Sequence, residues 1–414
     1  MRLITMGKSS ALPRTNPEIL RWARETAGLS IENAATALGI AAARGLSGSE
    51  RLRACEAGEA EPTRPMLVKM AKRYRRPLLV FYLSAPPRRG VRGEDFRKLP
   101  QDSESTDDAL LDALLRDVAV RQRLVRAALE EEDEAVPLPF VGAMRPDEGV
   151  DASIQKLRTV LGIDLEAYRK QSSPMEAFAF VRGAAEKAGV FVVLRGNLGS
   201  HHSNLPLSVF RGFALADPMA PFVVINEQDA PAAWSFTLLH EMVHLLLGET
   251  GVSGQGTGRL TEQFANQVAS EFLLPASELV RDFAGLQDNV KAIEASIGPW
   301  ASARNVSASA VAYRLFQQGR VSKATWRAID KRLRDRWLSE RGKRREQSRS
   351  REGGPDYYVV RAHRVGHALL GLTERMMRTG ALSTTDAGKV LGVRGTQVHS
   401  LLAAGNPSGA RHSA

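Results

Sequence analysis

The chain has 414 residues, of which 43% are hydrophobic and 25% charged, as in ordinary globular proteins. Its single cysteine, Cys55, excludes an internal disulfide, and no stretch approaches the roughly 20 apolar residues needed to cross a bilayer. The net charge of +11 is uneven: residues 1–93 hold 17 Lys and Arg against 7 Asp and Glu, and residues 316–414 hold 20 against 8, while the centre is acidic. The sequence therefore predicts a cytoplasmic protein without a membrane partner. For the two basic ends, the charge leaves two interpretations open: they bind nucleic acid, or they are ordinary protein surface on which arginine side chains are solvated.

Residues 14–84 are predicted to form a unit of short helices. Asn16, followed by proline, caps the first helix, and Gly28 ends it. Ser30 caps a second helix that stops at Gly39. A third helical pattern covers SERLRACEAGE, a fourth covers PMLVKMAKRYR, and the apolar stretch PLLVFYL closes the unit.

Residues 85–149 are predicted to connect this unit to the next. They begin with a linker rich in Pro, Arg and Gly, and continue as an acidic helix or helical pair over 105–134. From residue 150 the pattern alternates between helix and strand. Two strands are predicted at 207–217 and 221–229 from their Val, Phe and Ile content.

The next predicted helix is strongly apolar. It begins near Pro231, behind Asp229 as its cap, and Gly248 stops it. A Gly-rich loop and a second helix ending at Pro275 follow. Further helices are predicted to residue 340, then a mobile basic linker at 341–356 and a helical module at 357–405.

The apolar helix carries the motif His240-Glu241-Met242-Val243-His244. Positions i and i+4 lie one turn apart on the same face, so both imidazoles can reach one metal ion. Glu241 stands beside them, where it can act as the base that takes a proton from water. The alternative is a pair of satisfied core histidines. The pattern predicts a site for one zinc ion per chain, with Mn²⁺ as the alternative metal.

A catalytic zinc ion needs a third protein ligand. The best candidate is Glu262, 18 residues after His244 on the next helix. Glu271, on the same helix, is its competitor, but the two carboxylates face nearly opposite ways. Asn266, one turn after Glu262, is predicted to orient a ligand from outside the coordination sphere.

The stretches RGFALAD, PFVVINEQD, FTLLHEMVHLLLG and EQFANQVASEFLLP resemble the ImmA/IrrE metallopeptidase family. The resemblance covers about residues 150–290. It implies a gluzincin-like domain with Glu262 as third zinc ligand, and regulatory proteolysis of a repressor-type protein. It also implies a strand that lines the cleft and pairs with the substrate at a sheet edge, and Ser208–Ala216 is the predicted strand.

The N-terminal unit looks like a helix-turn-helix domain of the XRE type, which members of this family often carry. Such a domain places its third helix in the major groove of double-stranded DNA. Here the chain between Gly39 and Glu56 is longer than usual, so the recognition helix is predicted to start late, near Ser49. Arg51 and Arg53 are the expected base-proximal residues. A helical module that binds protein instead of DNA is the alternative.

The remaining histidines carry weaker signals. His201 and His202 fall in a predicted loop. Two interpretations are open: one of them stabilises an oxyanion, or both are exposed loop histidines. His363, His367 and His399 lie in the C-terminal module without ligand spacing. For that module three roles stay open: docking on the peptidase, sensing a signal, or forming a homodimer.

Together these features predict an α+β, mainly α protein with a helix-turn-helix unit, a zinc peptidase domain and a helical C-terminal extension. The predicted function is cleavage of a regulatory protein to control transcription or a stress response. The alternative is a DNA-binding regulator or antitoxin whose metal site is structural or sensory. A further rival is an interaction protein with a vestigial site that binds no zinc.

Overall fold

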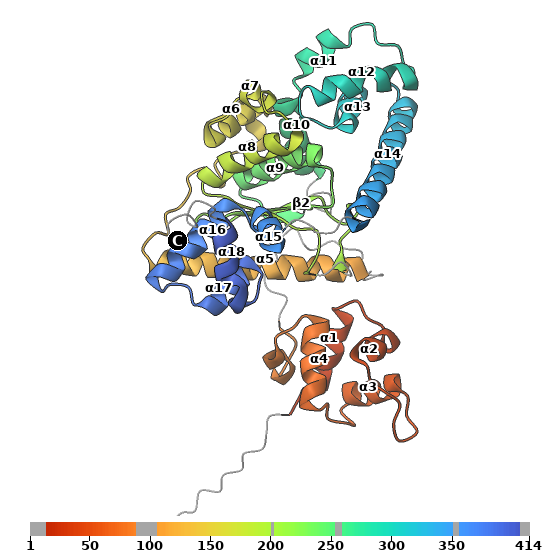
Figure 1. Cartoon of the computed structure of the whole chain (residues 1–414), viewed down its shortest axis with the longest axis vertical. Coiled ribbons are helices and arrows are strands. Elements are labelled where there is room, and N and C mark those ends of the chain that lie inside the picture. The colour runs from red at the N-terminus through yellow and green to blue at the C-terminus, as the bar shows by residue number, and fades with distance from the viewer. Residues whose placement is uncertain (1–13, 88–105, 200–202, 253–258, 351–355, 406–414) are drawn as a thin grey trace, which may run out of the picture. The chain divides into compact units, whose positions relative to one another are not determined.

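The computed structural model describes residues 14–87, 106–199, 203–252, 259–350 and 356–405 (Figure 1). These residues divide into two compact units, one within 1–92 and 100–114 and the other within 93–99 and 115–414. Helices dominate both units, and the larger one holds a small sheet. The chain is therefore mainly helical with a minor β component, as the sequence predicts.

The smaller unit is built from short helices. They are α1 (Pro17–Glu25), α2 (Ile31–Leu38), α3 (Gly48–Ala57), α4 (Arg64–Tyr74) and the 3₁₀ helix η1 (Leu78–Tyr82). The predicted caps Asn16 and Ser30 each accept a backbone hydrogen bond at the start of their helices. Helix α3 begins one residue before the predicted Ser49, behind a capping box formed by Ser47 and Glu50.

A buried ion pair joins α1 to α3 in this unit. The guanidinium of Arg24 donates to both carboxylate oxygens of Glu56, at 2.8 and 2.9 Å. Because the Glu56 side chain is only 3% exposed, its charge would be costly to bury without this partner. The pair therefore fixes how α3 packs on α1, beside the buried side chains of Ile19 and Leu52.

The larger unit surrounds its sheet with helices. Before the C-terminal module these are α5 (Thr106–Glu131, which belongs to this unit from residue 115 on), η3 (Pro146–Glu148), α6 (Val150–Leu161), α7 (Leu165–Arg169), α8 (Pro174–Lys187), α9 (Pro231–Leu247), α10 (Arg259–Leu273), α11 (Ala276–Asp282), α12 (Val290–Ser302), α13 (Ala308–Gln317) and α14 (Lys323–Ser350). Helix α9 matches the predicted apolar helix. Its cap position is Ala230, however, because the Asp229 carboxylate accepts from the adjacent Ala230 N–H and from Arg211.

The sheet has four short strands in the order β1-β3-β2-β4. They are β1 (Phe191–Leu194), β2 (Gly212–Leu215), β3 (Phe222–Ile225) and β4 (Gly251–Val252). Strand β1 runs parallel to β3, and β2 runs antiparallel to both of its neighbours. The strands predicted at 207–217 and 221–229 exist but are shorter, since turns replace their flanks.

The predicted edge strand does not lie at an edge. Phe213 of β2 pairs with Val224 of β3 on one side and with Val252 of β4 on the other. The expectation that Ser208–Ala216 presents a free edge to substrate is therefore wrong for β2. The reason is that the chain after α9 returns and adds a two-residue strand, which the Gly-rich sequence there did not reveal.

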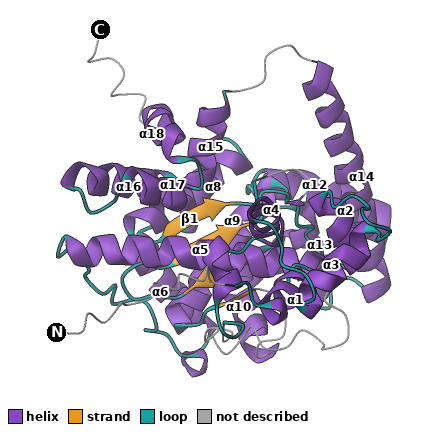
Figure 2. Ribbon diagram, turned by 90° about the horizontal axis from the view of Figure 1, so that it is seen from below, coloured by secondary structure: helices purple, strands orange, loops and turns teal. Residues whose placement is uncertain are grey.

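Helices cover both faces of the sheet. Figure 1 shows α9 and α8 above the strands and α5 below them, and Figure 2, seen from below, shows α5 crossing in front of the strands. The amide of Gln122 on α5 donates to the carbonyls of Leu215 and Ala220, which fixes α5 against this face. Helix α9 packs on β2 and β3 from the other face and between α8 and α10.

The C-terminal module packs against β1. Its helices are α15 (Tyr357–Val365), α16 (His367–Thr379), α17 (Thr384–Leu391), η5 (Gly395–Gln397) and α18 (Val398–Gly405). The N–H groups of Phe191 and Arg195 bond to the β3 side, so the carbonyl of Val192 points to the outer edge of β1. Arg182 of α8 donates to that carbonyl and to the carbonyl of His363 at the end of α15. The module and α8 thus close this edge together.

The basic segment predicted as a mobile linker is partly helical. Helix α14 continues to Ser350, so residues 341–350 extend the preceding helix. Arg, Lys, Glu and Gln are good helix formers, and the helix can continue through a solvated segment without an apolar face. The sequence prediction treated low apolar content as evidence against a helix, which it is not.

Candidate metal centre

Helices α9 and α10 bring the three predicted ligands together. His240 and His244 project from one face of α9, one turn apart, and Glu262 reaches them from the first turn of α10. One donor atom from each side chain lies within 4.8 Å of the others. Among the described residues, this is a group of metal-ligand type held by two packed helices.

The spacing of the donor atoms matches a tetrahedral metal site. The Nε2 atoms of His240 and His244 are 3.1 Å apart, and the Glu262 carboxylate oxygens lie 3.5 and 3.2 Å from them, respectively. Two ligand atoms each about 2.0–2.1 Å from a tetrahedral zinc ion are themselves about 3.3 Å apart. Two imidazoles and one carboxylate are also a donor set that zinc accepts in catalytic sites. The residues present therefore fit a zinc ion.

Burial and charge set the protonation of this group. Burial by itself lowers the pKa of His244, but hydrogen bonds to Glu249 and Glu262 and the charge of Glu241 raise that pKa to about 10. Burial acts to raise the pKa of Glu262, whereas its hydrogen bonds to His240 and His244 lower it to about 2. In the metal-free protein the carboxylate is thus ionised and His244 is protonated at neutral pH. Metal binding has to displace that proton.

Glu249 is a neighbour of the site that the sequence analysis missed. Its Oε2 lies 3.2 Å from Nδ1 of His244, on the side of the ring opposite the donor group. A carboxylate at this position fixes the orientation and tautomer of a metal-bound histidine. Its place just after the helix stop Gly248 is the signal that could have identified it.

Glu241 is fully buried next to the histidines, against the backbone of β2. A methyl group on Gly212 would stand 2.7 Å from Oε1 of Glu241 and 2.6 Å from a methyl carbon of Thr237. Real atoms do not approach so closely, so this strand position requires glycine. A glycine inside a strand often marks such a close approach, which is the sequence signal that was overlooked.

Replacing Gly212 with alanine is therefore expected to displace Glu241 while leaving the metal ligands in place. A misplacement of about 1 Å costs on the order of 100-fold in rate, so hydrolysis should fall by about that factor with zinc content unchanged. The measurement is zinc per chain together with the rate of cleavage. The matched control is Gly183→Ala in α8, where an added methyl meets no atom within 4 Å. A Gly212→Ala variant with wild-type activity would contradict this role for the close contact.

The other predicted site residues lie in different surroundings. Glu271 accepts from the backbone N–H of Ala276 and pairs with Arg314, so it does not join the metal group. Asn266 is half-buried on α10, and no hydrogen bond joins it to the two histidines or Glu262 within the described chain. Its predicted orienting role has no contact to support it, while Glu249 holds such a position.

The predicted DNA-contacting residues lie on α3 of the smaller unit. Arg51 donates to the carbonyl of Ala41 at 2.6 Å and so braces the long loop before α3. Arg53 is exposed and lies 3.7 Å from Glu32 of α2. Cys55 is buried, and burial raises the pKa of its thiol. His201 and His202 lie outside the described residues.

Comparison with known proteins gives a family match for part of the chain. A family model described as the IrrE N-terminal-like domain, Peptidase_M78, matches residues 185–316. The match covers about a third of the chain and includes all of β1–β4, α9 and α10. It starts later and ends later than the predicted peptidase domain at 150–290. No curated protein and no solved structure gives a significant match.

The match supports a relationship to the ImmA/IrrE family for this part of the chain, and a metallopeptidase-like function. The three-residue group that can hold a metal ion lies within the matched region. In the described part of the chain, no helix is both long enough and apolar enough to span a membrane.

Proposed function

We propose that the chain is a zinc-dependent metallo-endopeptidase that cleaves a regulatory protein. The observation that carries the proposal is the donor spacing of His240, His244 and Glu262 beside the buried carboxylate of Glu241. Neither a pair of core histidines nor a vestigial site would need a third charged side chain from another helix at this spacing.

Each residue has a distinct role in the proposed reaction. His240, His244 and Glu262 hold the ion, and zinc bound there supplies Lewis-acid polarisation of a peptide carbonyl and makes water acidic. Glu241 takes a proton from the attacking water and delivers it to the leaving amine. The apolar wall of α9 and the backbone of β2 around Glu241 keep this carboxylate away from bulk water.

The proposed substrate is a repressor-type protein, and the smaller unit is proposed to bind double-stranded DNA. Support comes from the basic N-terminal region, from the capped α2 and α3, and from the exposed guanidinium of Arg53. Binding of DNA would place the peptidase near the regulators it cleaves. The alternative is a DNA-binding regulator or antitoxin whose metal site is structural or sensory. The same basic regions favour it.

The test is metal-dependent cleavage. Purified chain should contain about one zinc ion, and wild type should generate new N-termini in the soluble proteome of its own cells. Removal of zinc by a chelator should abolish these N-termini, and added zinc should restore them, because the proposed reaction depends on the bound ion. If the wild-type chain binds no metal even when zinc is supplied, the proposed peptidase function is contradicted. The DNA-binding regulator would then be the better account.

A further inference from the structure

Helix α14 carries a row of basic side chains that the proposed reaction does not use. The helix holds 11 Lys and Arg against 4 Asp and Glu. In its first half, a spacing of three or four residues places four exposed cations on one face, and these are Lys323, Arg327, Lys331 and Arg334. They are called the basic stripe of α14 below. The stripe is about 16 Å long, at a rise of about 1.5 Å per residue.

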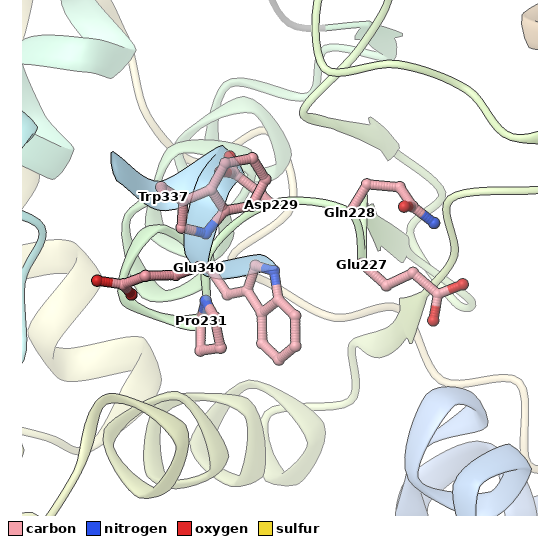
Figure 3. Close-up of a pocket in the computed structure, with 7 residues that line it drawn as sticks. Glu227, Gln228, Asp229, Pro231, Trp337 and Glu340 are labelled. Carbon is pink, nitrogen blue, oxygen red and sulfur yellow. The ribbon is translucent and has the colours of Figure 1, made fainter. Parts of the chain in front are cut away.

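The other side of α14 holds the helix against the larger unit. Arg332 and Arg336 both pair with Glu294 of α12. Further along the helix, Trp337 and Glu340 line a pocket together with the loop after β3 and the first turn of α9 (Figure 3). Figure 1 shows α14 at the outside of this unit. The basic stripe therefore faces solvent, and its charges can be removed without disturbing how the helix packs.

Three of the four cations in the basic stripe have no acidic partner. Arg334 pairs with Asp330 at 3.0 Å. Within the described chain no carboxylate forms an ion pair with the other three, not even Asp335, which lies one turn after Lys331. Like charges one turn apart on a helix repel each other. A polyanion that lies along the stripe relieves this repulsion and gains the attraction of the unpaired cations.

The form of the basic stripe favours double-stranded DNA over other polyanions. A helix that binds a membrane surface needs a wide apolar face to insert, whereas the other face of α14 packs on α12 and α13. Single-stranded nucleic acid is bound through aromatic side chains on which its bases stack, and the four residues of the stripe include none. Each strand of a duplex presents about one phosphate per 3.4 Å, so the stripe spans about five phosphates.

We propose that the basic stripe of α14 is a second DNA-binding surface, through which the larger unit contacts the phosphate backbone of double-stranded DNA without regard to base sequence. Lysine and arginine side chains on phosphates position a protein on a duplex but carry no sequence information. The stripe adds salt-dependent affinity and holds the unit with the metal centre near DNA-bound regulators. The inference goes beyond the proposed function, and its test requires neither zinc nor cleavage.

The experiment measures the DNA affinity of the full chain at several salt concentrations. A fluorescent duplex is titrated with wild type and with a stripe variant that carries Lys323→Ala, Arg327→Ala and Lys331→Ala. Each phosphate contact contributes about 0.9 to the slope of log affinity against log salt, so the variant should lose about 2.7 from that slope. Over a fourfold rise in salt, the affinity of wild type should therefore fall about 40-fold more than that of the variant. A duplex of unrelated sequence should give the same difference.

The matched control removes three exposed cations from other parts of the larger unit, through Arg145→Ala, Lys187→Ala and Arg378→Ala. It has the net charge of the stripe variant and should keep the slope of wild type. Both variants should unfold at the wild-type temperature, because the changed side chains are exposed.

Three outcomes would overturn the proposal. The first is a wild-type slope in the stripe variant, even if Arg53→Ala weakens binding, because all DNA contact would then belong to the smaller unit. The second is an equal loss of slope in the control, which would show an effect of net charge alone. The third is tighter binding of wild type to phosphatidylserine vesicles than to the duplex. Loss of peptidase activity with an intact stripe effect would instead count against the proposed function alone.

Discussion

Replacing Glu241 with glutamine is expected to leave about one zinc ion per chain and to reduce hydrolysis by at least about 100- to 10,000-fold. The amide keeps the size of the buried side chain and its place against Gly212, but it cannot accept a proton from water. The measurement is zinc by elemental analysis together with single-turnover cleavage of an identified substrate.

The control for this variant is Glu346→Gln, which makes the same chemical change on the surface and should retain full activity. If Glu241→Gln still cleaves at the wild-type rate, Glu241 is not the base. If it loses cleavage but keeps every regulatory effect in cells, the metal site serves a structural or sensory purpose. The regulator or antitoxin alternative would then be the better account.

Replacing Glu262 with alanine is expected to abolish zinc binding at micromolar metal. The variant removes the only carboxylate that approaches both histidine Nε2 atoms in the described structure, and it leaves two buried imidazoles as the remaining ligands. Two neutral ligands hold zinc much less tightly than two neutral ligands and one anion. Elemental analysis after dialysis and a competition assay with a zinc-binding dye measure the loss.

The informative comparison for Glu262→Ala is Glu271→Ala on the same helix. Because Glu271 binds Arg314 and the Ala276 N–H, its removal should lower thermal stability and leave zinc content unchanged. Full zinc occupancy in Glu262→Ala, combined with loss in Glu271→Ala, would show that the ligand assignment is reversed.

Local signals predicted most of the helices. Capping side chains located the starts of α1 and α2, and Pro231 and the stop at Gly248 located α9, because these signals act on the backbone next to them. The same reasoning failed at residues 341–350, where helix propensity continues α14 without a hydrophobic face. The strands that pair with β2 could not be predicted either, since strand pairing depends on contacts between residues distant in sequence.

The candidate site likewise contains residues that the sequence predicted and residues that it did not. The spacing of His240 and His244 is a local helical property, so the sequence alone placed them on one face. Helical phase showed only that Glu262 and Glu271 cannot both face the metal, and Glu262 was preferred for its spacing from His244 and from the family resemblance. The structure brings Glu262 to the histidines. Glu249 and Gly212 were missed although each carries a local signal, a carboxylate just after a helix stop and a glycine inside a strand, because the contacts that give these signals meaning form only in the folded chain.

The closure of β1 has a consequence for how a chain can approach this protein. Arg182 donates to the outward carbonyl of Val192, and α15 and α16 pack against β1, so this edge of the sheet is covered. In the described part of the chain, the strand at the other end of the sheet is β4 (Gly251–Val252), which follows the second histidine of α9 by seven residues. A strand of another chain cannot pair with β1 unless it displaces Arg182, so two copies cannot join through their β1 edges into a continuous sheet.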